Sequence, residues 1–247
     1  MHPDTLVSYS NLAQLLLRLG QPDEAMELFR RELRGSRLTH GSDHPLTLTA
    51  AARLADCLTT HEQLEAAEPL LRESVTLARK VYGRGHAECS EQTVKLIKLL
   101  EERGKMDEAE RLAWKEVGIS RSSHGAEHPI TRETTQLLTR LLSQQGKGLA
   151  ALPLLRSLHG DRHPRTMQAI SAVVMQLQQA GRPEEAEPLA REAAELSASV
   201  LGDGHPYALI ARNQLAAVLR SVEDIGRASA ETWSSAWASP AYAGHPL

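Results

Sequence analysis

The chain has 247 residues, of which 41% are apolar, 24% are charged and only 3% are aromatic. Its 28 basic and 31 acidic residues give a formal net charge of −3, which excludes the concentrated positive charge needed for a sequence-independent grip on nucleic acid or an anionic membrane. No apolar run approaches the roughly 18 residues that span a bilayer, and two cysteines, Cys57 and Cys89, are too few for a disulfide framework and fit a reducing, cytoplasmic compartment.

A histidine, usually followed by proline, recurs along the chain with a nearly constant period. The intervals are 42, 42, 42, 35 and 42 residues, and the histidines are His2, His44, His86, His128, His163 and His205. Counted from each histidine as position 1, position 15 is leucine and position 24 is alanine in all six copies. Because several columns keep one register, the sequence predicts six repeats that start near residues 2, 44, 86, 128, 163 and 205.

Each repeat is predicted to fold as two antiparallel helices. Proline fits the first position of a helix, and the histidine before it occupies the N-cap position. Leu12, Leu16 and Leu19 have the spacing of one apolar helix face. Glycine at position 19, in four of the six copies, allows the chain to leave the first helix, and a second helix follows after a short connection and runs to another glycine.

The fourth and sixth repeats depart from this pattern. The fourth lacks seven residues between Leu155 and His159, which is about two helical turns, so its second helix should be shorter but keep its exit direction. After Ala228 the pattern decays, and residues 231–247 are predicted to be a degenerate tail. Trp233 and Trp237 would share a helix face there and cover the open end of the sixth repeat, the alternative being a self-binding tail or a partner patch.

Repeats of this kind bury their apolar faces only by stacking on one another. The predicted fold is therefore all-α, a right-handed α-solenoid of about six antiparallel helix pairs over residues 2–230, with a concave surface. The alanine column would allow the two helices of a pair to approach closely beside the leucine column.

The residues of these columns resemble the tetratricopeptide repeat. The matching patterns are Leu12-Ala13-x2-Leu16 with Ala25-x3-Phe29, and Leu54-Ala55-x2-Leu58 with Ala67-x3-Leu71. The 42-residue period resembles the long repeats of kinesin light chains and nephrocystin-like proteins. HEAT repeats have a similar length, but the Gly-x2-Glu-Ala turn and the alanine column favour the tetratricopeptide alternative.

Several residue sets are candidates for a chemical role. Three His-Gly-x2-His sets, His40/His44, His124/His128 and His159/His163, have the spacing of paired ligands, but each lacks the further ligands of a tetrahedral zinc site and coincides with a repeat boundary. Cys57 and Cys89 lie in first helices without an activating basic cluster and are expected to be inert. We therefore expect no metal, no cofactor and no enzymatic activity.

The resemblance implies that first helices line a concave groove that binds a peptide. The groove positions are Asn11, Gln14, Arg53, Asp56, Lys95, Lys98, Gln136, Arg140, Asn213 and Gln214. The middle of this set is rich in cations, and the hypothesis is that the groove prefers acidic peptides. The alternative is that these are solvated helix faces, and Glu91, Glu101 and Glu133 lie nearby.

The predicted function is a non-catalytic protein–protein interaction scaffold that binds a peptide or partner protein in its concave groove, as the resemblance to the cargo-binding repeats of kinesin light chains implies. The alternative is a structural or regulatory repeat segment of a larger multidomain protein.

Overall fold

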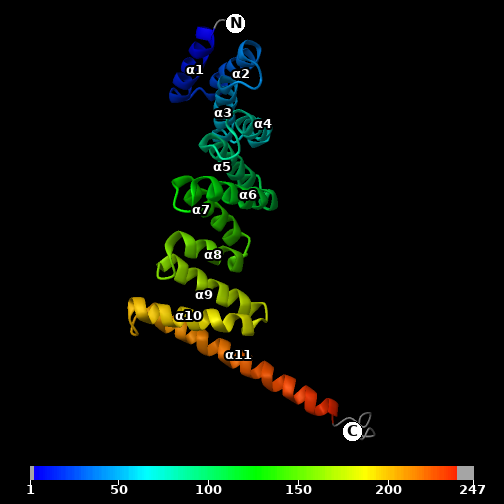
Figure 1. Ribbon diagram of the computed structural model, residues 1–247, viewed down its shortest axis with the longest axis vertical. Helices are drawn as coiled ribbons and strands as arrows, with labels where there is room; N and C mark the ends of the chain where they lie inside the picture. Colours follow the sequence, from blue (N-terminus) through cyan, green and yellow to red (C-terminus); the bar gives the residue numbers. More distant parts are fainter. Residues whose placement is uncertain (1–2, 238–247) are drawn as a thin grey trace. The chain divides into compact units, whose positions relative to one another are not determined.

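The computed structural model describes residues 3–237, without the side chains of residues 3, 226 and 228–237. Within that range the chain forms eleven α-helices and no strand (Figure 1). The helices are α1 (Pro3–Arg18), α2 (Pro22–His40), α3 (Pro45–Thr60), α4 (Leu64–Tyr82), α5 (Ala87–Glu102), α6 (Met106–His124), α7 (Pro129–Gln144), α8 (Gly148–His159), α9 (Pro164–Gln179), α10 (Pro183–Leu201) and α11 (Pro206–Trp237). We call the odd-numbered helices first helices and the even-numbered helices second helices.

The chain divides into two compact units, Met1–Leu141 and Leu142–Leu247. In the first unit the consecutive helices from α1 through α5 each contact the next one, up to α5 with α6, and in the second unit the consecutive helices from α8 to α11 contact one another. Three residues join the two helices of a pair and four residues join one pair to the next. Within each unit, connections this short make successive helices antiparallel neighbours, and the predicted all-α class built from antiparallel helix pairs is confirmed.

The histidine column caps the first helices. In five repeats the histidine Nδ1 accepts a hydrogen bond of 3.1 to 3.3 Å from the backbone N–H two residues later; these histidines are His44, His86, His128, His163 and His205. This bond satisfies one of the N–H groups that a helix start leaves without an intrahelical partner. The predicted N-cap role of the histidine is therefore confirmed for these five repeats.

The turn inside each pair depends on the left-handed residue at position 19. Gly104 has a φ of +71°, and the backbone N–H of the next residue, Lys105, then donates to the carbonyl of Leu100 at 2.9 Å. Glu62 takes the same place in the second repeat with a φ of +59°, and no other non-glycine residue of the described chain has a positive φ. Packing of α3 against α4 therefore holds a glutamate in a conformation that is normally left to glycine.

The alanine column lies in the core. Its members Ala25, Ala67, Ala109, Ala151 and Ala186 are at most 1% exposed, whereas the side chain of Ala228 is outside the described part. The leucine column is buried in the four central repeats and half-buried at Leu16 and Leu219. Small side chains thus face the seam between helices, as the predicted close approach requires.

Helix α8 is seven residues shorter than the other second helices, with 12 residues against 19. It still ends on a left-handed glycine, Gly160, whose carbonyl accepts a hydrogen bond from Thr166 Oγ1 at 2.8 Å. Thr47 makes the same bond to Gly41 at 2.7 Å in a full-length repeat. The predicted loss of two turns is confirmed, and the turn after α8 keeps the threonine–glycine hydrogen bond of a full-length repeat.

The sixth repeat does not form the predicted helix pair, because α11 runs without a break from Pro206 to Trp237. Its position 19 is Glu223, which stays helical. Glu62 also lacks the glycine, but the apolar residues of α4 that follow it are buried, including Ala67 and Leu71. After Glu223 the apolar columns decay, so little is gained by folding the chain back. The side chains of Trp233 and Trp237 lie outside the described residues.

A buried carboxylate connects α4 to the turn before α6. Glu68 accepts hydrogen bonds from Lys105 Nζ at 2.8 Å and from Arg72 Nη2 at 2.8 Å, and it also pairs with Arg103. Burial raises the pKa of Glu68, but these three cations outweigh it and lower the pKa to about 2. The pair α3–α4 is therefore tied to the pair α5–α6 by charge as well as by apolar packing.

Candidate functional site

The predicted groove residues lie on first helices and are exposed or half-buried. Eight of them are in the first unit, on α1, α3, α5 and α7, and we call this surface the first-helix face: Asn11, Gln14, Arg53, Asp56, Lys95, Lys98, Gln136 and Arg140. The remaining two, Asn213 and Gln214, lie on α11 in the second unit.

Arg53 joins the first two repeats. Its Nη1 donates to Ser10 Oγ at 2.7 Å and to Glu32 Oε1 at 2.8 Å, so one guanidinium contacts α1 and α2 from α3. Burial raises the pKa of Glu32 despite this pairing. The three residues border a hollow of about 200 Å³ that Asn11 also lines.

Lys95 of α5 lies between two carboxylates. Its Nζ is 2.9 Å from Asp56 of α3 and 3.2 Å from Glu91 of its own helix. Burial opposes the charge, but the two acids outweigh it and the pKa of Lys95 is raised. Lys95 and Lys98 both line a second hollow, of about 260 Å³, between α5 and α7.

Two further ion pairs continue from α5 to α7. Lys98 Nζ lies 3.4 Å from Glu133, and Arg140 Nη2 lies 2.5 Å from Glu101. Each cation of the predicted groove is thus paired with an acid of its own chain. The first-helix face is consequently a row of mixed charge bordered by two small hollows. The acids Glu91, Glu101 and Glu133 belong to it as much as the cations do, and Glu32 of α2 adjoins it through Arg53.

The histidine pairs have a structural role in the repeat boundary. The rings of His40 and His44 stack with centroids 4.9 Å apart, and the pairs His124/His128 and His159/His163 stack at 4.6 Å. In the second repeat Tyr82 replaces the first histidine and stacks on His86 at 4.7 Å. A tyrosine preserves this contact, so ring stacking explains the column. Among residues 3–237, no group of three or more His, Cys, Asp or Glu side chains could hold a metal ion.

Cys57 and Cys89 are both buried and free. Burial raises the pKa of each thiol, which keeps the sulfur protonated and unreactive. None of the helices in the described part of the chain is both long enough and apolar enough to span a bilayer.

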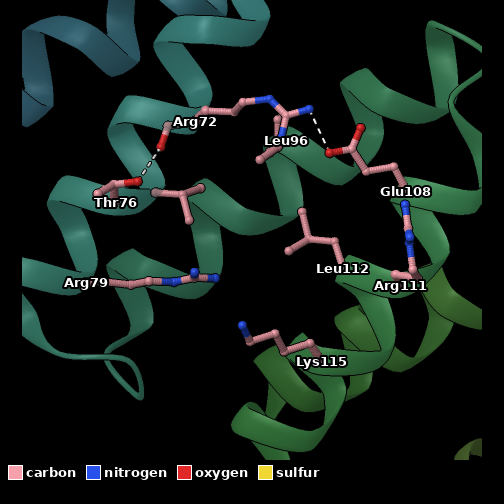
Figure 2. Close-up of a pocket in the computed structure, with 9 residues that line it drawn as sticks. Arg72, Thr76, Arg79, Leu96, Glu108, Arg111, Leu112 and Lys115 are labelled. Atoms are coloured by element: carbon pink, nitrogen blue, oxygen red, sulfur yellow. Dashed lines mark hydrogen bonds and ion pairs between the residues drawn. The ribbon is translucent and has the colours of Figure 1, made fainter.

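A pocket that the sequence analysis did not predict lies between the second helices α4 and α6 (Figure 2). It has a volume of about 480 Å³, and Arg79 from α4 and Lys115 from α6 extend toward each other across it. We call it the second-helix pocket; its lining residues are Arg72, Val75, Thr76, Arg79, Leu96, Glu108, Arg111, Leu112 and Lys115. Comparing charges between second helices, rather than only along first helices, would have revealed it.

Comparison with known proteins assigns the fold to a family. The tetratricopeptide repeat model matches residues 4–80 and 167–230, which is more than half of the chain. The chain belongs to the tetratricopeptide repeat family. No curated protein matches it significantly.

Solved structures resemble the chain in fold. A putative kinesin light chain with nearly identical TPR-like repeats from Podosopora anserina is 24% identical, with a TM-score of 0.57 over 81% of this chain and 98% of that one. The apo form of RapI is 13% identical, with a TM-score of 0.54 over 90% and 65% of the two chains. MamA protein is 13% identical, with a TM-score of 0.51 over 79% of this chain and 93% of that one. The predicted α-solenoid class and the resemblance to kinesin light chain-like repeats are confirmed at the level of fold.

Proposed function

We propose that the chain is a non-catalytic interaction scaffold whose first-helix face binds an extended peptide or a segment of a partner protein. The observation that carries this proposal is the row of cations and acids on α3, α5 and α7, which lies beside two hollows while the apolar columns of the same helices are buried. Membership of the tetratricopeptide repeat family supports it, because this fold is typical of interaction scaffolds. Free thiols at both cysteines support a cytoplasmic location.

An acidic peptide is the ligand that we propose for this face. Exposed ion pairs contribute only about 0–1 kcal/mol each, so a ligand carboxylate can replace Asp56 beside Lys95 or Glu101 beside Arg140 at little cost. A peptide that replaces several in-chain acids at once gains from linked contacts. Leucine side chains of the peptide would occupy the hollow between α5 and α7.

The test uses the whole chain and a fluorescein-labelled peptide of alternating glutamate and leucine, with the glutamine and lysine versions as controls. Lys95→Glu combined with Arg140→Glu should weaken binding by about tenfold or more, which corresponds to about 1.4 kcal/mol. Asp56→Asn combined with Glu101→Gln removes one of the two acids beside Lys95 and the acid beside Arg140, and should strengthen binding. Fluorescence anisotropy gives the affinities, and circular dichroism checks that each variant is folded. Equal affinity of all variants for the glutamate peptide would remove the proposal.

A second candidate function is a structural or regulatory repeat segment of a larger multidomain protein. Leu12 and Leu15 of α1 are 47% and 52% exposed, whereas their equivalents Leu54 and Cys57 in α3, which packs against α2, are buried. A second helix of a preceding repeat, packed on α1 as α2 packs on α3, would bury this surface. Fusing a designed helix pair to the N-terminus should raise Tm, and Leu12→Gln combined with Leu15→Gln should cancel the rise; an undiminished rise would contradict this candidate.

A further inference from the structure

The second helices α2, α4, α6 and α8 each carry an arginine seven residues before the histidine that starts the next repeat, whereas α10 does not. In the first repeat Arg37 Nη2 donates to both carboxylate oxygens of Glu73, on α4, at 2.6 Å. In the second unit Arg156 of α8 donates to Glu192 of α10 at 2.6 Å. One arginine–carboxylate pair thus links neighbouring second helices at two places in the chain.

The same pair is broken between α4 and α6. One period after Arg37 stands Arg79, and one period after Glu73 stands Lys115, so a cation replaces the acid. Arg79 Nε and Nη2 are buried and have no hydrogen-bond partner in the described chain. Figure 2 shows the guanidinium of Arg79 and the ammonium of Lys115 directed toward each other. Burying unpaired cationic donors is costly, so an anionic partner would stabilise this position.

The neighbouring acids leave the Nε and Nη2 donors of Arg79 without a hydrogen-bond partner. Glu108 is occupied by Arg72, whose Nη2 lies 2.7 Å from it. Glu116 is close enough for its charge to interact with that of Arg79, but neither of its buried carboxylate oxygens accepts a hydrogen bond from the guanidinium. Among the side chains that line the second-helix pocket, four are cationic and one is acidic.

The shape and remaining chemistry of the pocket indicate an organic anion. Its volume of about 480 Å³ falls within the range of about 300–1,000 Å³ that is typical of small-ligand sites. Val75, Leu96 and Leu112 line it with apolar surface beside the cations. Two facing cations are neutralised by a group that carries nearly two negative charges, whereas a carboxylate carries one. A guanidinium also matches two phosphate oxygens at once.

We propose that the second-helix pocket binds a phosphate monoester, with Arg79 and Lys115 holding the phosphate and the apolar wall holding the organic group. This site is separate from the first-helix face and goes beyond the scaffold function. The phosphate group is the recognised chemistry, and it has two sources: a small phosphorylated metabolite or a phosphorylated side chain.

The experiment measures binding of phenyl phosphate to the whole chain by isothermal titration calorimetry at low ionic strength, with benzoate and inorganic phosphate as comparison ligands. Phenyl phosphate should bind at least about tenfold more tightly than benzoate, because the phosphate contacts both cations. Absence of binding, or equal binding of benzoate, would overturn the proposal. A phosphoserine peptide that binds more tightly than phenyl phosphate assigns the source to a phosphorylated protein; the reverse order assigns it to a small molecule, and both orders support the site.

Lys115→Glu is the decisive variant because it recreates the pair that Arg37 makes with Glu73. It should abolish phenyl phosphate binding and raise the Tm of the ligand-free chain. Arg79→Gln should also abolish binding, whereas Arg37→Gln, the matched control at the same repeat position, should leave it unchanged. Circular dichroism verifies folding of each variant. Unchanged binding in folded Lys115→Glu or Arg79→Gln would refute the assignment.

Discussion

Leu12 and Leu54 occupy the same repeat position, yet the structure predicts different costs for removing them. Leu54 is 3% exposed in α3, which packs against α2, and Leu12 is 47% exposed in α1. Leucine to alanine removes three carbon atoms, worth about 2.4 kcal/mol when fully buried at about 0.8 kcal/mol each. Leu54→Ala also leaves a cavity, so we expect a total loss of about 3 kcal/mol or more, against about 1.2 kcal/mol for the half-exposed Leu12→Ala.

Urea unfolding followed by circular dichroism measures both costs. The two residues lie in the same unit, so one transition reports on both variants and their difference is more reliable than either value alone. An equal loss in the two variants would refute the reasoning that the preceding second helix buries this column.

Three further predictions concern the turn, the buried carboxylate and the alanine column. Glu62→Gly should raise the free energy of unfolding by about 0.5–1 kcal/mol, because it removes the strain of a left-handed glutamate. Gly104→Glu should lower the free energy of unfolding by a similar amount. A lower free energy of unfolding in Glu62→Gly would contradict the presence of strain at this turn. Glu68→Gln should cost about 1–2 kcal/mol at neutral pH, discounted for the exposure of Arg72 and Lys105. Folding lowers the pKa of Glu68 from 4.5 to about 2, so its contribution to the free energy of unfolding is complete above pH 4.5 and is lost as the pH falls toward 2. The unfolding curves of the unchanged chain and of Glu68→Gln should therefore converge near pH 2. A difference that stays constant with pH would argue against the network. Ala109→Leu should lower stability by about 1–3 kcal/mol through overpacking, measured as a fall in Tm, and an unchanged Tm would place this residue outside the seam.

Periodicity predicted most of the helix boundaries, because each repeat carries its own start and stop chemistry. Histidine at the N-cap determines where α3 begins, and the glycine that follows the helix determines where the shortened α8 ends. The unbroken α11 was not predictable from a single position, since Glu62 and Glu223 are the same residue type at the same place. The helix that follows, and whether it can be buried, decides between a turn and a continued helix.

The candidate sites were less predictable because side-chain partners come from neighbouring repeats. Counting cations on first helices located Lys95 and Arg140, but Asp56 and Glu101, which pair with them, lie on adjacent helices. The second-helix pocket depends on one reversed charge, Lys115, at a position where Glu73 has a partner. Such a change leaves the repeat pattern intact and becomes visible only when equivalent pairs are compared in three dimensions.

Hydrogen–deuterium exchange of the whole chain, with and without a saturating concentration of the glutamate–leucine peptide, tests most directly whether the first-helix face binds ligands. The account predicts slower exchange in α3, α5 and α7 when the peptide is present, with α4 and α6 largely unchanged. Protection confined to α4 and α6, or no change in any helix of the first unit, would contradict it.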